Sequence, residues 1–113
     1  MRLPEKDLNT VTALSGSGPA FVACALQAMI DGATALGLPV AAANALALQT
    51  LLGTAKVLTA SGAPSVPDFI AAVATPGGTT AAGTDVLDAS GARAAFASTI
   101  AAAAERAARL AAQ

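Results

Sequence analysis

The chain is organised around Ala74-Thr75-Pro76-Gly77-Gly78-Thr79-Thr80, a loop sequence that separates two long helix-forming regions. Pro76 disfavours helical backbone angles at the residue before it, so a helix that precedes the stretch has to end there. The adjacent glycines permit backbone angles closed to other residues and let a ligand approach the main chain closely. A threonine after them is well placed to cap the next helix. The stretch therefore predicts a helix–loop–helix junction.

The same loop has a possible binding role. Bare amide groups, flanking hydroxyls and a helix N-terminus together suit a small anion such as a carboxylate. The alternative is an ordinary Pro-Gly-Gly turn that joins two helices and binds nothing. The loop residues alone leave both interpretations open.

Composition narrows the class of protein. With 113 residues the chain is long enough for one domain, and its abundant alanine favours helix. Tyr, Trp and His are absent and Cys24 is the single cysteine, so the chain has no Ser-His-Asp or Cys-His arrangement, no disulfide framework and no expected metal site. The net charge of -1 gives no electrostatic reason to expect nucleic acid or an acidic membrane surface. Met1–Thr10 lacks the apolar core of a signal peptide, so we expect a cytoplasmic protein.

The placement of charge predicts an oligomer. Between Leu8 and Gly83 the only charged residues are Asp31, Lys56 and Asp68, and the whole chain is 12% charged, against about a quarter in an average domain. A small domain with so little charge is expected to bury surface against a partner. A membrane span is the competing explanation, but glycine and proline interrupt the apolar windows, and a span needs ~20 predominantly apolar residues. We therefore expect an obligate oligomer and no membrane.

The pattern of glycine and proline predicts an all-α fold, a bundle of about five helices without strands. Residues 1–10 are interpreted as a linker or leader, and residues 11–113 as the helical domain. Val11–Pro19 is expected to be a non-helical turn in which Ser17 caps the first helix. The five helices are expected at about 19–36, 40–60, 67–74, 79–88 and 92–112.

The first of these helices carries two adjacent apolar stripes, which predict contacts on more than one side. Asp31 is either a functional carboxylate or a solvated or paired surface acid. Lys56 is either a ligand for an anion or a surface lysine with a buried stem. Cys24 has no His partner and is expected to be a small core residue.

Four segments, in this order and spacing, resemble the C-terminal domain of pyrroline-5-carboxylate reductase: Val11–Ala20, Gly37–Pro39, Thr75–Thr80, and Val86–Leu87 with Gly91 and Arg93. The resemblance covers about Leu8 to Leu110. Enzymes of this family reduce 1-pyrroline-5-carboxylate to L-proline with NADPH or NADH, the last step of proline biosynthesis. The resemblance implies a dimerisation domain whose helices interlock with those of a second copy, as a homodimer or a higher ring of dimers. It also implies that NADP or NAD binds to an N-terminal Rossmann domain, which these residues do not include, so no cofactor is expected for this chain alone.

The resemblance also assigns roles within the loop. The hydroxyl at position 75, where the family usually has serine, would contact the substrate carboxylate. Thr80 would lie near the ring nitrogen and the nicotinamide as the candidate catalytic hydrogen-bond or proton donor. The implied substrate-binding set is Val73 as a wall of the pocket, the Thr75 hydroxyl, the amides of Gly77, Gly78 and Thr79, and Thr80.

Two functions from different classes follow. The chain is either the oligomerisation and substrate domain of a reductase, inactive until a nucleotide domain is supplied, or a stand-alone helical dimer that serves as a structural or small-carboxylate-binding module. Whether it is by itself an enzyme stays open, and we expect the isolated chain to be inactive.

Overall fold

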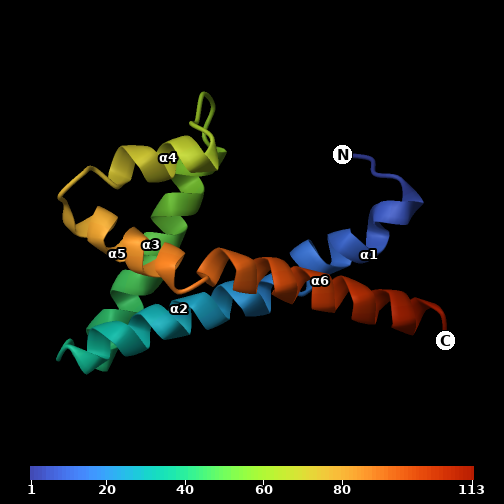
Figure 1. The fold of residues 1–113 in the computed structure, drawn as a ribbon, viewed down its shortest axis with the longest axis horizontal. Coiled ribbons are helices and arrows are strands. Elements are labelled where there is room, and N and C mark those ends of the chain that lie inside the picture. The colour runs from blue at the N-terminus through green and yellow to red at the C-terminus, as the bar shows by residue number, and fades with distance from the viewer. The chain divides into compact units, whose positions relative to one another are not determined.

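The computed structural model describes all 113 residues, and every regular element in it is a helix (Figure 1). The all-α prediction is confirmed. The elements are the 3₁₀ turn η1 (Glu5–Asp7), α1 (Leu8–Val11), the π-helical turn η2 (Thr12–Gly16), α2 (Gly18–Ala35), α3 (Val40–Thr59), α4 (Val66–Val73), α5 (Thr79–Ala89) and α6 (Ala92–Ala111).

The five longer helices, α2 to α6, begin and end within one residue of the predicted positions. Local chemistry accounts for these ends. Gly37, with φ 103°, follows the end of α2, and Pro39 immediately precedes α3. The Ser65 hydroxyl caps α4 by accepting a hydrogen bond from the Asp68 amide at 3.2 Å. Gly91, in the left-handed region with φ 78°, separates α5 from α6.

The predicted non-helical turn at Val11–Pro19 is wrong. Helical turns run from Glu5 to Gly16, and α2 begins two residues later. Ser17 has right-handed helical backbone angles, and its amide donates to the Thr12 carbonyl at 2.9 Å, five residues back. The physical reason is that one extra residue widens the turn just before Pro19, whose missing N–H would interrupt a regular α-helical ladder. The sequence pattern therefore marks an interruption of the hydrogen bonding and not an exit from the helix.

The chain divides into two compact units. In the unit formed by residues 1–23 and 86–113, α1 and the π-helical turn pack against α6, and Ala13 is completely buried. In the unit formed by residues 24–85, Ile30 and Ala43 are the buried apolar side chains. Within this second unit, no pair of helices makes an extended contact. The chain by itself therefore has almost no hydrophobic core.

Large apolar side chains are instead exposed on every long helix. Cys24 is also exposed, so its predicted place in a core is wrong for the single chain, because no other helix in the unit of residues 24–85 makes an extended contact with α2. The exposed side chains include Val22, Met29, Leu46, Leu48, Leu51, Leu52, Val57, Val73, Val86, Leu87, Phe96 and Leu110.

Two helical runs, Glu5–Ala35 and Val40–Thr59, are long and apolar enough to cross a membrane when judged by length and composition alone. The core helices of soluble proteins pass the same test, so this property does not assign a membrane to the chain.

Candidate functional site

The quoted loop joins α4 to α5 and lies within the unit of residues 24–85. Helix α4 ends in a tight turn at Ala74, whose backbone angles of φ -86° and ψ 64° are those of an inverse γ-turn. In this turn the Thr75 amide donates to the Val73 carbonyl at 3.1 Å. The chain direction therefore changes at once where the helix stops.

A second turn follows over Thr75–Gly78. The Gly78 amide donates to the Thr75 carbonyl at 3.1 Å and closes the turn. Pro76 occupies its second position and Gly77, with φ 78°, its third, which is the residue pattern of a type II turn. The two glycines thus differ in purpose, since only Gly77 needs a backbone conformation that other residues avoid.

Helix α5 begins directly after this turn, and its N-terminal amides are free. Its first backbone hydrogen bond runs from the Ala82 amide to the Gly78 carbonyl at 3.3 Å. Free amides at a helix N-terminus attract negative charge, both as donors and through the helix dipole. The amides without a partner in the chain are those of Gly77, Thr79, Thr80 and Ala81.

The threonine hydroxyls of the loop are also unpaired. Those of Thr75, Thr79 and Thr80 make no hydrogen bond within the chain, and Thr80 is half-buried while the other two are exposed. Elsewhere, six helical threonines donate to a carbonyl of their own helix: Thr34, Thr50, Thr54, Thr59, Thr84 and Thr99. The loop therefore concentrates donors that the fold itself does not use.

Two of the predicted site residues, Val73 and Gly78, differ from these free donors. Val73 is the last residue of α4 and is 47% exposed, so it presents an apolar surface next to the loop. The Gly78 amide is already donated within the turn, and its predicted contact with a carboxylate stays a prediction that would require this hydrogen bond to be shared.

The isolated polar candidates lie outside the loop. Asp31 is exposed and accepts a hydrogen bond from the Gln27 side chain at 2.8 Å, which are the surroundings of a paired surface acid. Lys56 is exposed on α3 and forms no ion pair within the chain. The structure places neither Asp31 nor Lys56 at a candidate functional site.

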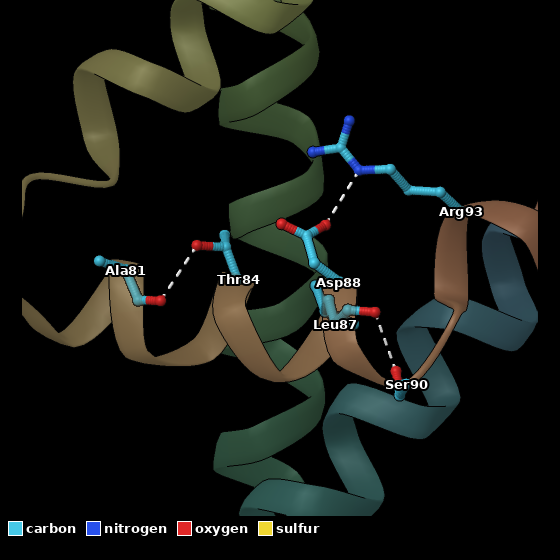
Figure 2. A network of polar contacts seen from close by, with 6 residues as sticks. All are labelled: Ala81, Thr84, Leu87, Asp88, Ser90 and Arg93. Atoms are coloured by element: carbon cyan, nitrogen blue, oxygen red, sulfur yellow. Dashed lines mark hydrogen bonds and ion pairs between the residues drawn. The ribbon is translucent and has the colours of Figure 1, made fainter.

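A second set of polar contacts runs along α5 and past its end, and it includes Leu87 and Arg93, which contributed to the family resemblance (Figure 2). The Arg93 Nε atom donates to Asp88 Oδ1 at 3.1 Å and spans the left-handed Gly91. Both side chains are largely exposed, at 75% and 56%, so the ion pair is worth only about 0–1 kcal/mol. The sequence analysis identified Arg93 but not its partner Asp88, because Asp88 lies in α5 and Arg93 in α6. The hydroxyls of Ser90 and Thr84 donate to the carbonyls of Leu87 and Ala81 at 2.9 and 3.2 Å.

A family model described as pyrroline-5-carboxylate reductase dimerisation matches residues 5–110 of the chain. The chain belongs to this family. A pyrroline-5-carboxylate reductase of Synechocystis sp. is 45% identical over 98 residues, 85% of this chain and 36% of the relative. Pyrroline-5-carboxylate reductase 3 of Bos taurus is 44% identical over 108 residues, 96% of this chain and 35% of the relative. The chain thus spans about a third of the length of these reductases.

Solved reductases share the fold of this dimerisation domain. The crystal structure of 1-pyrroline-5-carboxylate reductase from Streptococcus pyogenes matches with a TM-score of 0.88 and 38% identity, over 95% of this chain and 41% of that one. The pyrroline carboxylate reductase of Plasmodium falciparum, solved with NADP bound, matches with a TM-score of 0.85 and 30% identity, over 95% and 42% of the two chains.

The residues of this dimerisation domain do not by themselves fit a dinucleotide such as the NADP of the Plasmodium enzyme. A Rossmann-type site needs parallel strands with a glycine-rich turn that leads into a helix, and every element here is helical. What the loop offers is a set of amides and hydroxyls without any charged side chain, since residues 69–84 contain none. Such a set suits one small anionic group.

Proposed function

We propose that this chain is the dimerisation and substrate-binding domain of a pyrroline-5-carboxylate reductase. The complete cytoplasmic enzyme would reduce 1-pyrroline-5-carboxylate to L-proline in proline biosynthesis, with NADP or NAD held by an N-terminal Rossmann domain. Residues 1–10 would include the connection to that domain, with helical structure beginning at Glu5. The observation that carries the proposal is the cluster of free amides and unpaired hydroxyls at the start of α5, in a chain of this family.

Different donors of the loop bind different groups of the substrate. The Thr75 hydroxyl and the amides of Gly77 and Thr79 bind the carboxylate, because an exposed helix N-terminus favours negative charge. Thr80, half-buried in the first turn of α5, donates a hydrogen bond to the ring nitrogen, which must be protonated when the C=N bond is reduced. Val73 supplies an apolar wall for the ring carbons.

The exposed apolar faces are covered by a second copy of the chain. Large apolar side chains are exposed on every long helix of the single chain. Obligate dimers typically bury ~2,000–5,000 Å² in total and have interfaces that resemble a domain core cut in half. The homodimer, alone or within a ring of dimers, therefore supplies the core that α2 to α5 lack, and no membrane is required.

The test uses the purified chain and a fusion of it behind the nucleotide domain of a characterised relative. We expect the chain alone to bind L-proline, measured by calorimetry, but to bind no NADPH and to have no reductase activity. The fusion should reduce pyrroline-5-carboxylate. A fusion that is folded and binds NADPH but has no activity would contradict the proposal.

A stand-alone carboxylate-binding dimer is the second candidate, and it is favoured by one observation: all of the loop donors come from a single short segment and need no other domain. The coding sequence immediately upstream separates the candidates. A glycine-rich βαβ pattern there supports the reductase, and its absence from the gene supports the stand-alone module.

A further inference from the structure

We infer that Gly78 is a positioning residue whose missing side chain determines where the Thr75 hydroxyl lies, so that positions 75 and 78 act as a coupled pair in carboxylate binding. The inference deepens the proposed function and rests on it for the identity of the ligand. It assigns Gly78 a steric role that is separate from any contact of its own amide.

The steric observation is specific to this glycine. A Cβ atom added at Gly78 would lie 3.0 Å from Thr75 Oγ1 and 3.2 Å from the Thr75 carbonyl oxygen. Among the other glycines, only Gly16 has any such neighbour, a methyl group at an ordinary 3.7 Å. The Thr75 hydroxyl thus occupies the space that a side chain at Gly78 would need.

Backbone conformation does not explain the glycine at this position. Gly77 has φ 78°, which other residues adopt only with strain, whereas the φ of Gly78 lies outside the left-handed region. Alanine could therefore adopt the backbone angles of Gly78. An alanine Cβ would instead be closer than usual to the Thr75 hydroxyl and carbonyl, which would have to move by a few tenths of an ångström.

The position of this hydroxyl matters because of what lies next to it. Gly78 is the residue before α5, so a hydroxyl packed on it lies beside the free amides with which α5 begins. Threonine is restricted about χ1, so its hydroxyl has few alternative positions. A methyl group at position 78 would require the Thr75 hydroxyl and carbonyl to move by a few tenths of an ångström, and we infer that Thr75 does so by changing its χ1 rotamer or by lengthening the turn hydrogen bond between the two residues.

The first experiment measures the Thr75 side chain directly and needs no ligand. Three-bond couplings across χ1, recorded on the isotopically labelled chain in its native oligomer, report the rotamer. We expect a single rotamer in the wild type, an altered or averaged one in Gly78→Ala, and no change in Gly83→Ala, the matched control on α5, where an added Cβ has no neighbour within 4 Å. Identical couplings in Gly78→Ala and the wild type would overturn the inference.

The second experiment measures the coupling as affinity for L-proline. Gly78→Ala should weaken binding about tenfold, the loss expected for one hydrogen bond to a charged group. Thr75→Val should weaken it to a similar extent, and the double variant little more than either single one. Losses that multiply in the double variant would contradict the coupling. If the wild type binds no L-proline, the proposed function fails, and the χ1 couplings still decide the steric inference.

Discussion

Thr75 and Thr80 lie at opposite ends of one loop, and their hydroxyls are expected to affect different kinetic terms. In the fused reductase, a hydroxyl that only holds the carboxylate makes the same contact in the ground state and the transition state. Thr75→Val should therefore raise KM by about tenfold and leave kcat nearly unchanged, as measured by steady-state kinetics. A fall in kcat with an unchanged KM would show that Thr75 does not act as a simple carboxylate ligand.

Thr80→Val should instead lower kcat, by ~10²-fold, because a hydrogen bond to the ring nitrogen strengthens as the nitrogen becomes protonated. The matched control is Thr84→Val, one turn along α5. The Thr84 hydroxyl is already donated to the Ala81 carbonyl and faces no ligand in the proposal, so this variant should keep both kinetic constants. Wild-type kinetics for Thr80→Val would remove Thr80 from the catalytic step.

At the scale of single elements, one glycine inside α5 and one just after it should respond in opposite ways to alanine. Gly91 has φ 78°, so Gly91→Ala should cost about 1–2 kcal/mol of unfolding free energy. Gly83 lies inside α5 with no heavy atom near its missing Cβ, so Gly83→Ala should stabilise by up to about 1 kcal/mol. Urea denaturation at one fixed chain concentration measures both, and equal effects would contradict the assigned role of Gly91.

The helices were the most predictable part of the sequence, because their ends are chemically marked. Gly37 and Gly91 adopt positive φ values that a helix does not continue through, Pro39 and Pro76 lack the N–H that a helix interior needs, and the structure ends or begins helices beside them. The prediction for Val11–Pro19 was wrong because it relied on the same residue types. A proline with nearby glycines also permits a helix that widens by one residue, and sequence alone does not separate a widened turn from an open one.

At the scale of the whole molecule, the exposed apolar face of α2 provides the sharpest test of assembly. Met29 is 58% exposed in the single chain, so an isolated monomer would tolerate glutamate there. In the proposed dimer the same change buries an unpaired charge, and Met29→Glu should abolish dimerisation in light scattering. Gln27→Glu adds the same charge to the same helix at a polar position and should cost only a few tenths of a kcal/mol. A wild-type chain that is monomeric at micromolar concentration would contradict the dimer.

Burial was less predictable than helicity. The two apolar stripes of α2 predict contacts on more than one side, but apolar periodicity is the same whether the covering surface belongs to the same chain or to another. Cys24 illustrates the difficulty, since it was predicted to be a small core residue and is exposed in the single chain. For the loop, the sequence predicted which residues carry the donors. It did not predict that the Gly78 amide donates within the turn, or that Gly78 lies against the Thr75 hydroxyl.

The absence of extended contacts among α2 to α5 has a consequence for the chain as it leaves the ribosome. If a second copy supplies the missing core, the last stage of folding is a bimolecular reaction. With an association rate constant of ~10⁶ M⁻¹s⁻¹, chains at ~10 nM would wait on the order of 100 s for a partner, and chains at ~1 μM about one second. During that interval the exposed leucines are open to aggregation and to proteases. The yield of active protein should therefore rise more steeply than expression level, and neighbouring ribosomes on one message would shorten the search.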